Sequence, residues 1–278
     1  MSLPKSHQDI TVAVVQPNVN PNTKWQNKKE VLFIMDSLHQ EAVKLNPDLI
    51  IFPETALPSY LVRDNRTRNS LQRIVNSSGI PLLTGTIHTS FENNSRYYFN
   101  SSMFLIPDKN YELYSKIHLV PFAEYDLLPA IFHPLTKLNI NIDRGNFKAG
   151  NNYKVFKYKN LLFSNLICYE SSIPSISRTF VSKGAEFLVI QANDGWLGSS
   201  FGPHQHFELA RLRAIENRIP VVRCANTGIS GMINFDGSVA EKVKLNEEKI
   251  IFDSLSTNKN RSFYTKYGDI FAIIISII

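Results

Sequence analysis

An α/β fold, with helices covering the faces of sheets, is the fold class that this sequence of 278 residues predicts. Short apolar runs typical of buried strands alternate along the chain with segments whose apolar residues recur every three or four positions, as on one face of a helix. No Ser-, Gly- or Pro-rich linker separates these segments, and only 12 glycines and 14 prolines occur. We therefore expect a single domain, because a chain of this length can fold around one sizeable core.

In the first half of the chain, Ile10–Gln16 is a short apolar run that predicts a buried strand. The helix expected next, at Lys24–Leu45, places five apolar residues on one face: Val31, Met35, Leu38, Ala42 and Leu45. A second strand is predicted at Asp48–Phe52, and a shorter helical pattern surrounds Leu71, Ile74 and Val75. The remaining strands expected in this half are Pro81–Ile87 and Tyr97–Ile106.

In the second half, apolar runs and helical patterns continue to alternate. The expected strands are Leu161–Ile167, Phe187–Gln191 and Val221–Cys224. Helices are expected between them, near Ile173–Ser182 and His204–Asn217. This regular alternation is what favours α/β layers over separate helical and strand regions.

Two segments do not follow this alternation. Phe122–Asn152 shows no clear period, and a loop of about thirty residues in a compact domain is usually functional or disordered. Its apolar part, Leu127–Leu135, is expected to pack on the body, contact a lipid or cover a site. The C-terminal run Ile270–Ile278 is apolar throughout, and nine residues fit either a last buried strand or the opening turns of a membrane helix.

The composition excludes several classes of protein. The net charge of +6 comes from basic residues scattered singly, which indicates a solvated surface, and no nucleic-acid motif occurs. No signal peptide and no apolar stretch of membrane-spanning length is found. Two cysteines cannot build a disulfide framework. His204 and His206 are two residues apart and do not face each other on a helix, so we expect no metal site and no cofactor.

Cys168 is the first candidate for chemistry. It ends an apolar strand just before a helical pattern, and the N-terminus of a helix favours a thiolate and can bind an oxyanion. The alternative is a small core residue. Cys224 lacks such a turn and is expected in the core.

Two charged residues also follow strand ends. Glu54 stands after a buried strand, where burial would raise its pKa and suit a general base; the alternative is a cap or a surface acid. Lys116 lies where a strand enters the long loop and could stabilise an oxyanion, although single lysines are usually solvated. Glu124 and Glu170 also follow strand ends and could orient the lysine or the base.

Glu54, Lys116 and Cys168, in that order and each after a strand, resemble the triad of the nitrilase superfamily of carbon-nitrogen hydrolases. Longer motifs over nearly the whole chain are similar to those of the nitrilase-like domain of the apolipoprotein N-acyltransferase family. These motifs are Phe52-Pro-Glu-Thr-Ala-Leu-Pro58, Tyr114-Ser-Lys-Ile-His-Leu-Val-Pro-Phe-Ala-Glu-Tyr125, Ile167-Cys-Tyr-Glu170, Asn193-Asp-Gly-Trp-Leu-Gly198, Gly202-Pro-His-Gln-His206, Ala210-Arg-Leu-Arg-Ala-Ile-Glu216, Asn226-Thr-Gly228 and Phe263-Tyr-Thr-Lys-Tyr-Gly-Asp269. Several independent motifs in the right order are stronger evidence than any one of them.

The resemblance implies a four-layer αββα sandwich over residues 1–266, followed by an apolar tail over residues 267–278. It also implies roles: Glu54 as general base, Cys168 as the nucleophile that carries a thioester, and Lys116 with the backbone N–H of Tyr169 as oxyanion stabilisers. Three further residues would support them: Glu124 beside the lysine and in the acyl-transfer step, Glu170 as a supporting acid, and Asn100 near the site.

The implied activity is transfer of an acyl group from a phospholipid to the N-terminal amine of an apolipoprotein, at the bacterial inner membrane. The family's block of membrane helices is missing from this chain, so a truncated or split enzyme with a membrane-helix partner is one expectation. A soluble amidase of the same superfamily is the alternative, favoured by the missing membrane part. A non-enzymatic interaction module is disfavoured because Glu54, Lys116 and Cys168 are all present.

Overall fold

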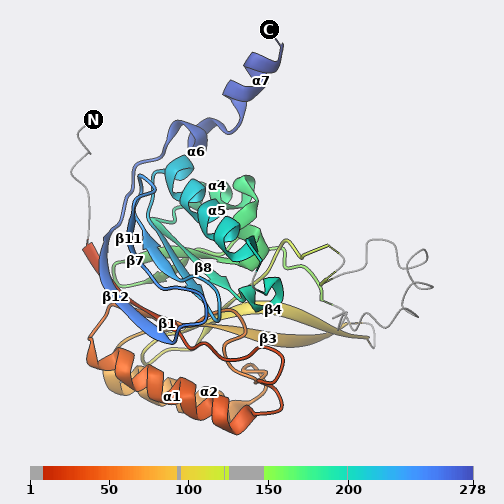
Figure 1. The fold of residues 1–278 in the computed structure, drawn as a ribbon, viewed down its shortest axis with the longest axis vertical. Coiled ribbons are helices and arrows are strands. Elements are labelled where there is room, and N and C mark those ends of the chain that lie inside the picture. The colour runs from red at the N-terminus through yellow and green to blue at the C-terminus, as the bar shows by residue number, and fades with distance from the viewer. Residues whose placement is uncertain (1–8, 93–94, 122, 125–146, 199, 278) are drawn as a thin grey trace.

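The structure is a computed structural model that describes residues 9–92, 95–121, 123–124, 147–198 and 200–277. In these ranges the chain forms two six-stranded sheets packed face to face, and a pair of helices covers the outer face of each (Figure 1). The result is the expected four-layer αββα sandwich.

The first sheet has the strand order β12-β1-β2-β3-β4-β5. Its strands are β12 (Lys249–Ser256), β1 (Asp9–Gln16), β2 (Leu49–Ile51), β3 (Leu82–Glu92), β4 (Ser95–Leu105) and β5 (Glu112–Ser115). β1, β2 and β3 are parallel, and the connections between them are made by the helices α1 (Lys28–Lys44) and α2 (Asn65–Ser78). The second helix begins where the side chain of Asp64 accepts a hydrogen bond from the backbone N–H of Thr67, and ends at Gly79 in the left-handed conformation.

The second sheet has the order β11-β10-β9-β8-β7-β6. Its strands are β11 (Val239–Lys242), β10 (Gly231–Ile233), β9 (Val221–Ala225), β8 (Phe187–Ala192), β7 (Leu161–Ile167) and β6 (Phe156–Tyr158). β7, β8 and β9 are parallel, and α4 (Pro174–Ser182) and α5 (Gly202–Asn217) cover the outer face. Two short 3-10 helices, η2 (Cys168–Ser172) and η3 (Asp194–Leu197), follow β7 and β8.

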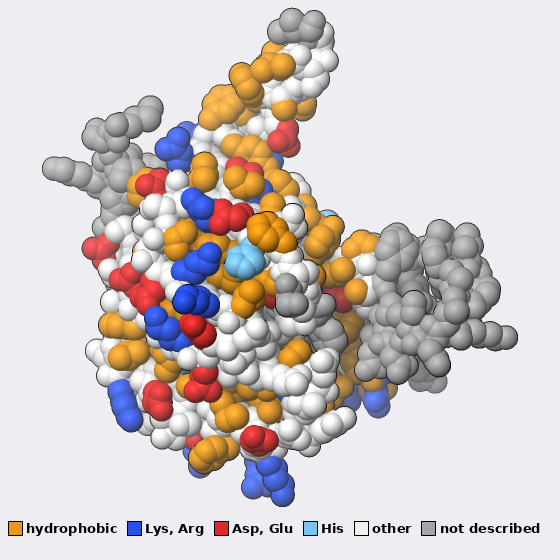
Figure 2. Space-filling model, viewed as in Figure 1, with side chains coloured by type: hydrophobic (Ala, Val, Ile, Leu, Met, Phe, Trp, Pro, Cys, Tyr) orange, Lys and Arg blue, Asp and Glu red, His pale blue; other side chains and the backbone are white. Residues whose placement is uncertain are grey.

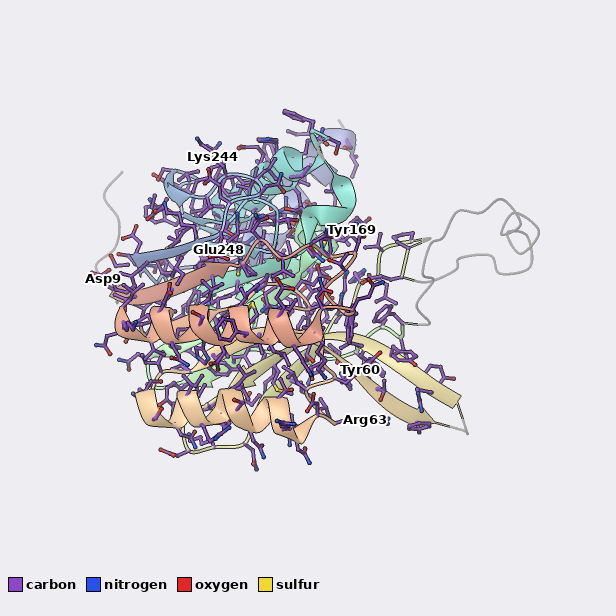
Figure 3. All side chains as sticks on the ribbon, turned by 60° about the horizontal axis from the view of Figure 1, so that its bottom comes forward. Asp9, Tyr60, Arg63, Tyr169, Lys244 and Glu248 are labelled. Atoms are coloured by element: carbon purple, nitrogen blue, oxygen red, sulfur yellow. The ribbon has the colours of Figure 1, made fainter. Side chains whose placement is uncertain are left out.

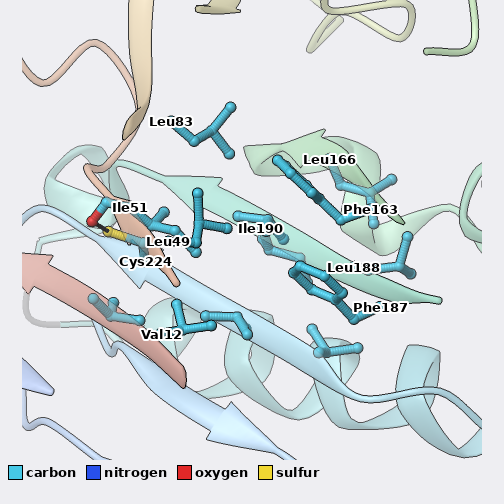
Figure 4. Close-up of a cluster of buried hydrophobic side chains, with 14 of the residues drawn as sticks. Val12, Leu49, Ile51, Leu83, Phe163, Leu166, Phe187, Leu188, Ile190 and Cys224 are labelled. Carbon is cyan, nitrogen blue, oxygen red and sulfur yellow. Dashed lines mark hydrogen bonds between the residues drawn. The ribbon is translucent and has the colours of Figure 1, made fainter. Parts of the chain in front are cut away.

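Alternation along β1 shows how the apolar core is divided. Val12 and Val14 face the second sheet, whereas Ala13 and Val15 face the helices α1 and α2. Figure 4 shows the cluster between the sheets, and Cys224 lies within it. Its thiol donates hydrogen bonds to the carbonyl oxygens of Val15 and Ile51, so the prediction of a core cysteine is confirmed.

A buried amide also joins the two sheets by hydrogen bonds. Gln191, at the end of β8, donates from Nε2 to the carbonyl oxygen of Phe52 at 2.5 Å. Its Oε1 accepts from Ser102 Oγ of β4 at 2.5 Å and from Asn165 Nδ2 of β7 at 3.0 Å. Phe52 precedes Glu54 by two residues, and Asn165 precedes Cys168 by three. The hydrogen bonds of Gln191 therefore fix the end of β2 relative to the end of β7.

Most of the predicted elements are confirmed with small changes at their ends. The first helix begins at Lys28 rather than Lys24, because Lys24 turns its ammonium group into the protein interior. β3 and β4 extend beyond the predicted runs as a long hairpin. The strand expected before Lys116 is β5, whereas the short or half-exposed strands β6, β10, β11 and β12 were not predicted.

The C-terminal segment differs from the buried-strand alternative, which is therefore wrong. It forms the short helix α6 (Phe263–Tyr267) and then α7 (Ile270–Ile277), which projects from the body (Figure 1). None of the residues of α7 is buried, Phe271 being 68% exposed, and Figure 2 shows hydrophobic side chains along this projection. Among the described residues no helix has the length and apolar character needed to cross a membrane. The expectation for Leu127–Leu135 falls outside the described residues.

We expect Gln191→Met to lower the free energy of unfolding by about 3 kcal/mol, because a buried carbonyl, hydroxyl and amide would each lose a partner. Urea unfolding followed by circular dichroism measures this loss. The matched control is Gln40→Met on the exposed face of α1, expected within about 0.5 kcal/mol of wild type. If both substitutions lowered the free energy of unfolding equally, Gln191 would not stabilise the contact between the two sheets.

Candidate active site

Three strand ends from both sheets bring Glu54, Lys116 and Cys168 to the same edge of the sandwich. Glu54 follows β2 by three residues, Lys116 follows β5 directly, and Cys168 follows β7 directly. In their ionised forms the three groups lie close enough to shift one another's pKa values, so the structure brings the predicted residues together. Figure 3 shows Tyr169, next to Cys168, at the same end of the molecule as Tyr60 and opposite Asp9.

A hydrogen-bonded chain of side chains connects the two glutamates to the lysine. Asn100 Nδ2 donates to Glu54 Oε1 at 2.7 Å and to Glu124 Oε1 at 3.0 Å. The other oxygen of Glu124 pairs with Lys116 Nζ at 2.7 Å and accepts from the backbone N–H of Val120 at 2.7 Å. One amide thus holds both carboxylates in place, and Glu124 directly contacts the lysine.

Burial and mutual attraction set the charges of this chain. Lys116 is only 1% exposed. Burial alone would lower the pKa of Lys116, but the charges of Glu54, Cys168 and Glu124 outweigh it and raise the pKa well above its usual value. Burial also raises the pKa of Glu54, an effect that Lys116 opposes and Glu124 strengthens. The lysine is therefore charged, and Glu54 has a raised affinity for a proton.

Cys168 sits in a strained turn. Its φ of +51° lies in the left-handed region, which residues other than glycine seldom adopt and which typically costs about 1–3 kcal/mol. The side chain is partly exposed. Burial raises the pKa of the Cys168 thiol well above its usual value, the charge of Glu54 raises it further, and Lys116 opposes both. The net effect favours the neutral thiol of Cys168 over the thiolate in the resting protein.

Glu170 fixes this turn. Its Oε1 accepts hydrogen bonds from Tyr114 Oη and Ile117 N, both at 2.7 Å, and from His118 N at 3.2 Å, while its Oε2 accepts from Ile167 N at 2.7 Å. Burial raises the pKa of Glu170, and these donors together with Lys116 oppose the rise. The carboxylate thus ties the Cys168 turn to the segment that carries Lys116.

Tyr169 extends its side chain outward. It is 36% exposed, so its position is compatible with a role of its backbone rather than of its ring. Among the described residues no group of His, Cys, Asp and Glu is arranged to hold a metal ion.

A buried polar cluster beneath Cys168 was assigned no role from the sequence. His206 Nε2 lies 3.0 Å from the carbonyl oxygen of Cys168 and 2.8 Å from Ser171 Oγ. Its Nδ1 lies 2.9 Å from Asp194 Oδ1, and Arg223 donates to Asp194 Oδ2 at 2.6 Å. Burial and Arg223 lower the pKa of His206, and Asp194 opposes them. The sequence did contain a signal for this cluster: Arg223 lies inside the apolar strand β9, and a buried charge requires a partner of opposite charge.

Close backbone approach shapes the turn that carries Glu54. A Cβ atom at Gly85 of β3 would lie 2.3 Å from the backbone nitrogen of Thr55 and 2.6 Å from the carbonyl oxygen of Pro53. The backbone N–H of Gly85 donates to that carbonyl at 3.1 Å. Only glycine allows β3 to pass so close beneath the turn.

Comparison with known proteins identifies the relatives of this chain. The carbon-nitrogen hydrolase family model matches residues 11–263. The apolipoprotein N-acyltransferase of Geobacter metallireducens is 31% identical over 98% of this chain, and that of Rickettsia typhi is 34% identical over 99%. The matches cover 53% and 55% of those proteins, so the chain spans about half the length of the curated relatives it matches. The resemblance found in the motifs is confirmed.

Solved structures confirm the fold. A carbon-nitrogen hydrolase from Helicobacter pylori G27 superposes with a TM-score of 0.71 at 15% identity, covering 97% of this chain and 95% of that one. Nit3 of Saccharomyces cerevisiae, a member of the nitrilase superfamily, superposes with a TM-score of 0.66 at 19% identity, covering 89% and 90%. An amidase from Nesterenkonia gives 0.67 at 15% identity, covering 96% of each chain.

We expect Asp194→Asn to lower the free energy of unfolding by about 3 kcal/mol or more near neutral pH, because Arg223 would stay buried without its partner. Burial raises the pKa of Asp194, but Arg223 and His206 outweigh it and hold the pKa well below its usual value. A carboxyl group whose pKa is lowered by folding stabilises the folded state at pH values above its pKa in the unfolded chain. The difference in the free energy of unfolding between wild type and Asp194→Asn should therefore shrink as the pH falls below about 4.

Urea unfolding at several pH values measures this difference. The control is Asp236→Asn in an exposed turn, expected to change stability by less than about 1 kcal/mol. A difference between Asp194→Asn and wild type that stays constant down to low pH would contradict the assignment.

Proposed function

The chain belongs to the carbon-nitrogen hydrolase family, and from that premise we propose that it is an N-acyltransferase that moves a fatty acyl group from a phospholipid to the N-terminal amine of an apolipoprotein. One observation carries the proposal: the relatives that match over nearly the whole chain bear the name apolipoprotein N-acyltransferase. The convergence of Glu54, Lys116 and Cys168 supports it.

In the first half-reaction, Glu54 takes the proton of the Cys168 thiol as sulfur attacks the carbonyl carbon of the phospholipid ester. Lys116 and the backbone N–H of Tyr169 stabilise the oxyanion that forms. The oxyanion then collapses, the ester C–O bond breaks, and the leaving lysophospholipid takes the proton from Glu54. The acyl group remains on Cys168 as a thioester. A neutral thiol next to Glu54, whose carboxyl group has a raised affinity for a proton, suits this sequence.

In the second half-reaction, the amine of the lipoprotein attacks the thioester. Glu54 takes a proton from that amine, the C–S bond breaks, and the proton returns to the sulfur of Cys168. Glu124 keeps Lys116 oriented toward the oxyanion in both steps, because it accepts from the lysine at 2.7 Å. Transfer wins over hydrolysis only while water is kept from the thioester, a role that we propose for the apolar segment Leu127–Leu135.

Membrane association is part of this proposal. The apolar side chains of α7 are exposed on a helix that projects from the body (Figure 2). Exposed apolar surface of this extent is typical of a contact with lipid or with another apolar element. We propose that residues 267–278 form such a contact at the bacterial inner membrane, with lipid or with a membrane-helix partner.

Hydrolysis of a small linear amide is the second candidate. It is favoured by the amidase from Nesterenkonia, which shares this fold over nearly its whole length. Release of ammonia from small amides, without any acyl adduct on the protein, would identify this activity.

We expect incubation with phospholipid vesicles to add one acyl group to Cys168, because the thioester is an obligatory intermediate of the proposed transfer. Mass spectrometry of the intact protein and of its peptides measures the adduct and its position. Cys168→Ala should abolish the adduct, whereas Cys224→Ala, in the core, should retain it. An adduct that persists in Cys168→Ala, or one found on Cys224, would refute the proposed mechanism.

We expect Lys116→Met to slow formation of the acyl-enzyme by a factor of about 100 or more, since it removes the charge that stabilises the oxyanion. Rapid quenching followed by mass spectrometry gives the rate. Lys109→Met, at an exposed lysine in the turn between β4 and β5, is the control and should change the rate less than about twofold. A rate that is equal for the two variants would remove Lys116 from the mechanism.

A further inference from the structure

Lys24 is a buried cation of this site for which the proposed mechanism gives no role. It is 5% exposed and lies in the turn between β1 and α1. Its Nζ donates to the carbonyl oxygen of Thr55 at 2.8 Å and to Thr55 Oγ1 at 2.9 Å. A solvated lysine would expose its ammonium group, so these two acceptors must compensate for its burial.

The residue that Lys24 holds is itself strained. Thr55 has a φ of +42°, in the left-handed region that a β-branched side chain adopts only under constraint. Thr55 is bonded to Glu54 in the chain, and the close passage of Gly85 limits the turn from the other side. Release of Thr55 would therefore shift the Glu54 carboxylate.

Lys24 also acts on Glu54 through its charge. Four other side chains face Glu54 from different elements: Lys116 after β5, Glu124, Asn100 of β4 and Cys168 after β7. Within this set Glu124 favours the protonated form of Glu54, whereas the two lysines favour the carboxylate. Burial lowers the pKa of Lys24 to about 8, and the charge of Glu54 opposes that decrease. Lys24 is thus charged at and below neutral pH.

We propose that Lys24 is a positioning residue of the site: its ammonium group holds the Thr55 turn and keeps Glu54 in the carboxylate form that accepts the proton of Cys168. This inference rests on the proposed role of Glu54 as that proton acceptor. It gives Glu54 two cations with separate tasks, since Lys116 acts on Cys168 and Lys24 contacts the Thr55 turn.

The test uses alkylation of Cys168 by iodoacetamide, which requires removal of the thiol proton but neither phospholipid nor lipoprotein. Intact-protein mass spectrometry gives the rate for the full chain across a range of pH, and the buried Cys224 serves as an internal unreactive thiol. Removal of the positive charge of Lys24 raises the pKa of Glu54 further, so less carboxylate is present at low pH. For Lys24→Met we expect a rate about tenfold below wild type at about pH 6, and within about threefold at about pH 9.

Two companion variants separate charge from position. Lys24→Gln can still donate to Thr55 but is neutral, so its pH profile should shift as that of Lys24→Met does. Lys24→Arg retains the charge and should restore the wild-type profile to within about threefold. Thermal unfolding confirms that each variant is folded, and any one folded neutral variant is sufficient for the test.

The outcomes distinguish this inference from the proposed function. A folded neutral variant whose rate is unchanged, or reduced by the same factor at every pH, overturns the inference about Lys24. Glu54→Gln should react more slowly than wild type near neutral pH, because the base that accepts the proton of Cys168 is removed. If Glu54→Gln instead reacts like wild type, the role of Glu54 fails, and the inference about Lys24 fails with it.

Discussion

The buried ammonium group of Lys116 is the constraint on which the arrangement of this site depends. A charge that is 1% exposed is tolerated only beside opposite charges, and Glu54 and Glu124 supply them. The lysine and a shared amide, that of Asn100, offset the repulsion between the two glutamates and hold them close together. The ends of β2 and β5 must therefore meet, and the amide of Gln191 brings the end of β7 to the same edge.

Two of the eight non-glycine residues with positive φ in the described part of the chain lie next to the proposed proton transfer. Cys168 and Thr55 both have positive φ, and both are held by buried side chains: Glu170 accepts a hydrogen bond from Ile167, the residue before Cys168, and Lys24 donates to Thr55. Strained backbone persists where its surroundings over-determine it, and such positions cluster at functional sites. The same contacts that compensate for the strain also orient the groups that we propose react.

The sequence predicted what depends on local pattern. Glu54 and Cys168 could be located because each closely follows an apolar strand, Lys116 because it lies within a longer motif before the loop, and Cys224 because it lies within an apolar run. The role of Lys24 was hidden, since its burial depends on Thr55, thirty-one positions away in the chain. His206 and Asp194 were missed for the same reason, because only the fold brings Arg223 to them. The apolar run Ile270–Ile278 fitted a strand and a helix equally well, because nine uniformly apolar residues show no period that distinguishes the two.

The central claim is that the thiol of Cys168 is neutral at rest and loses its proton to Glu54 only as it reacts. The most direct test is the ultraviolet absorbance of the thiolate, measured as a difference between wild type and Cys168→Ala while the pH is raised. The account predicts no thiolate signal from Cys168 at neutral pH. A full thiolate signal there would contradict it, since a cysteine that is already ionised requires no base.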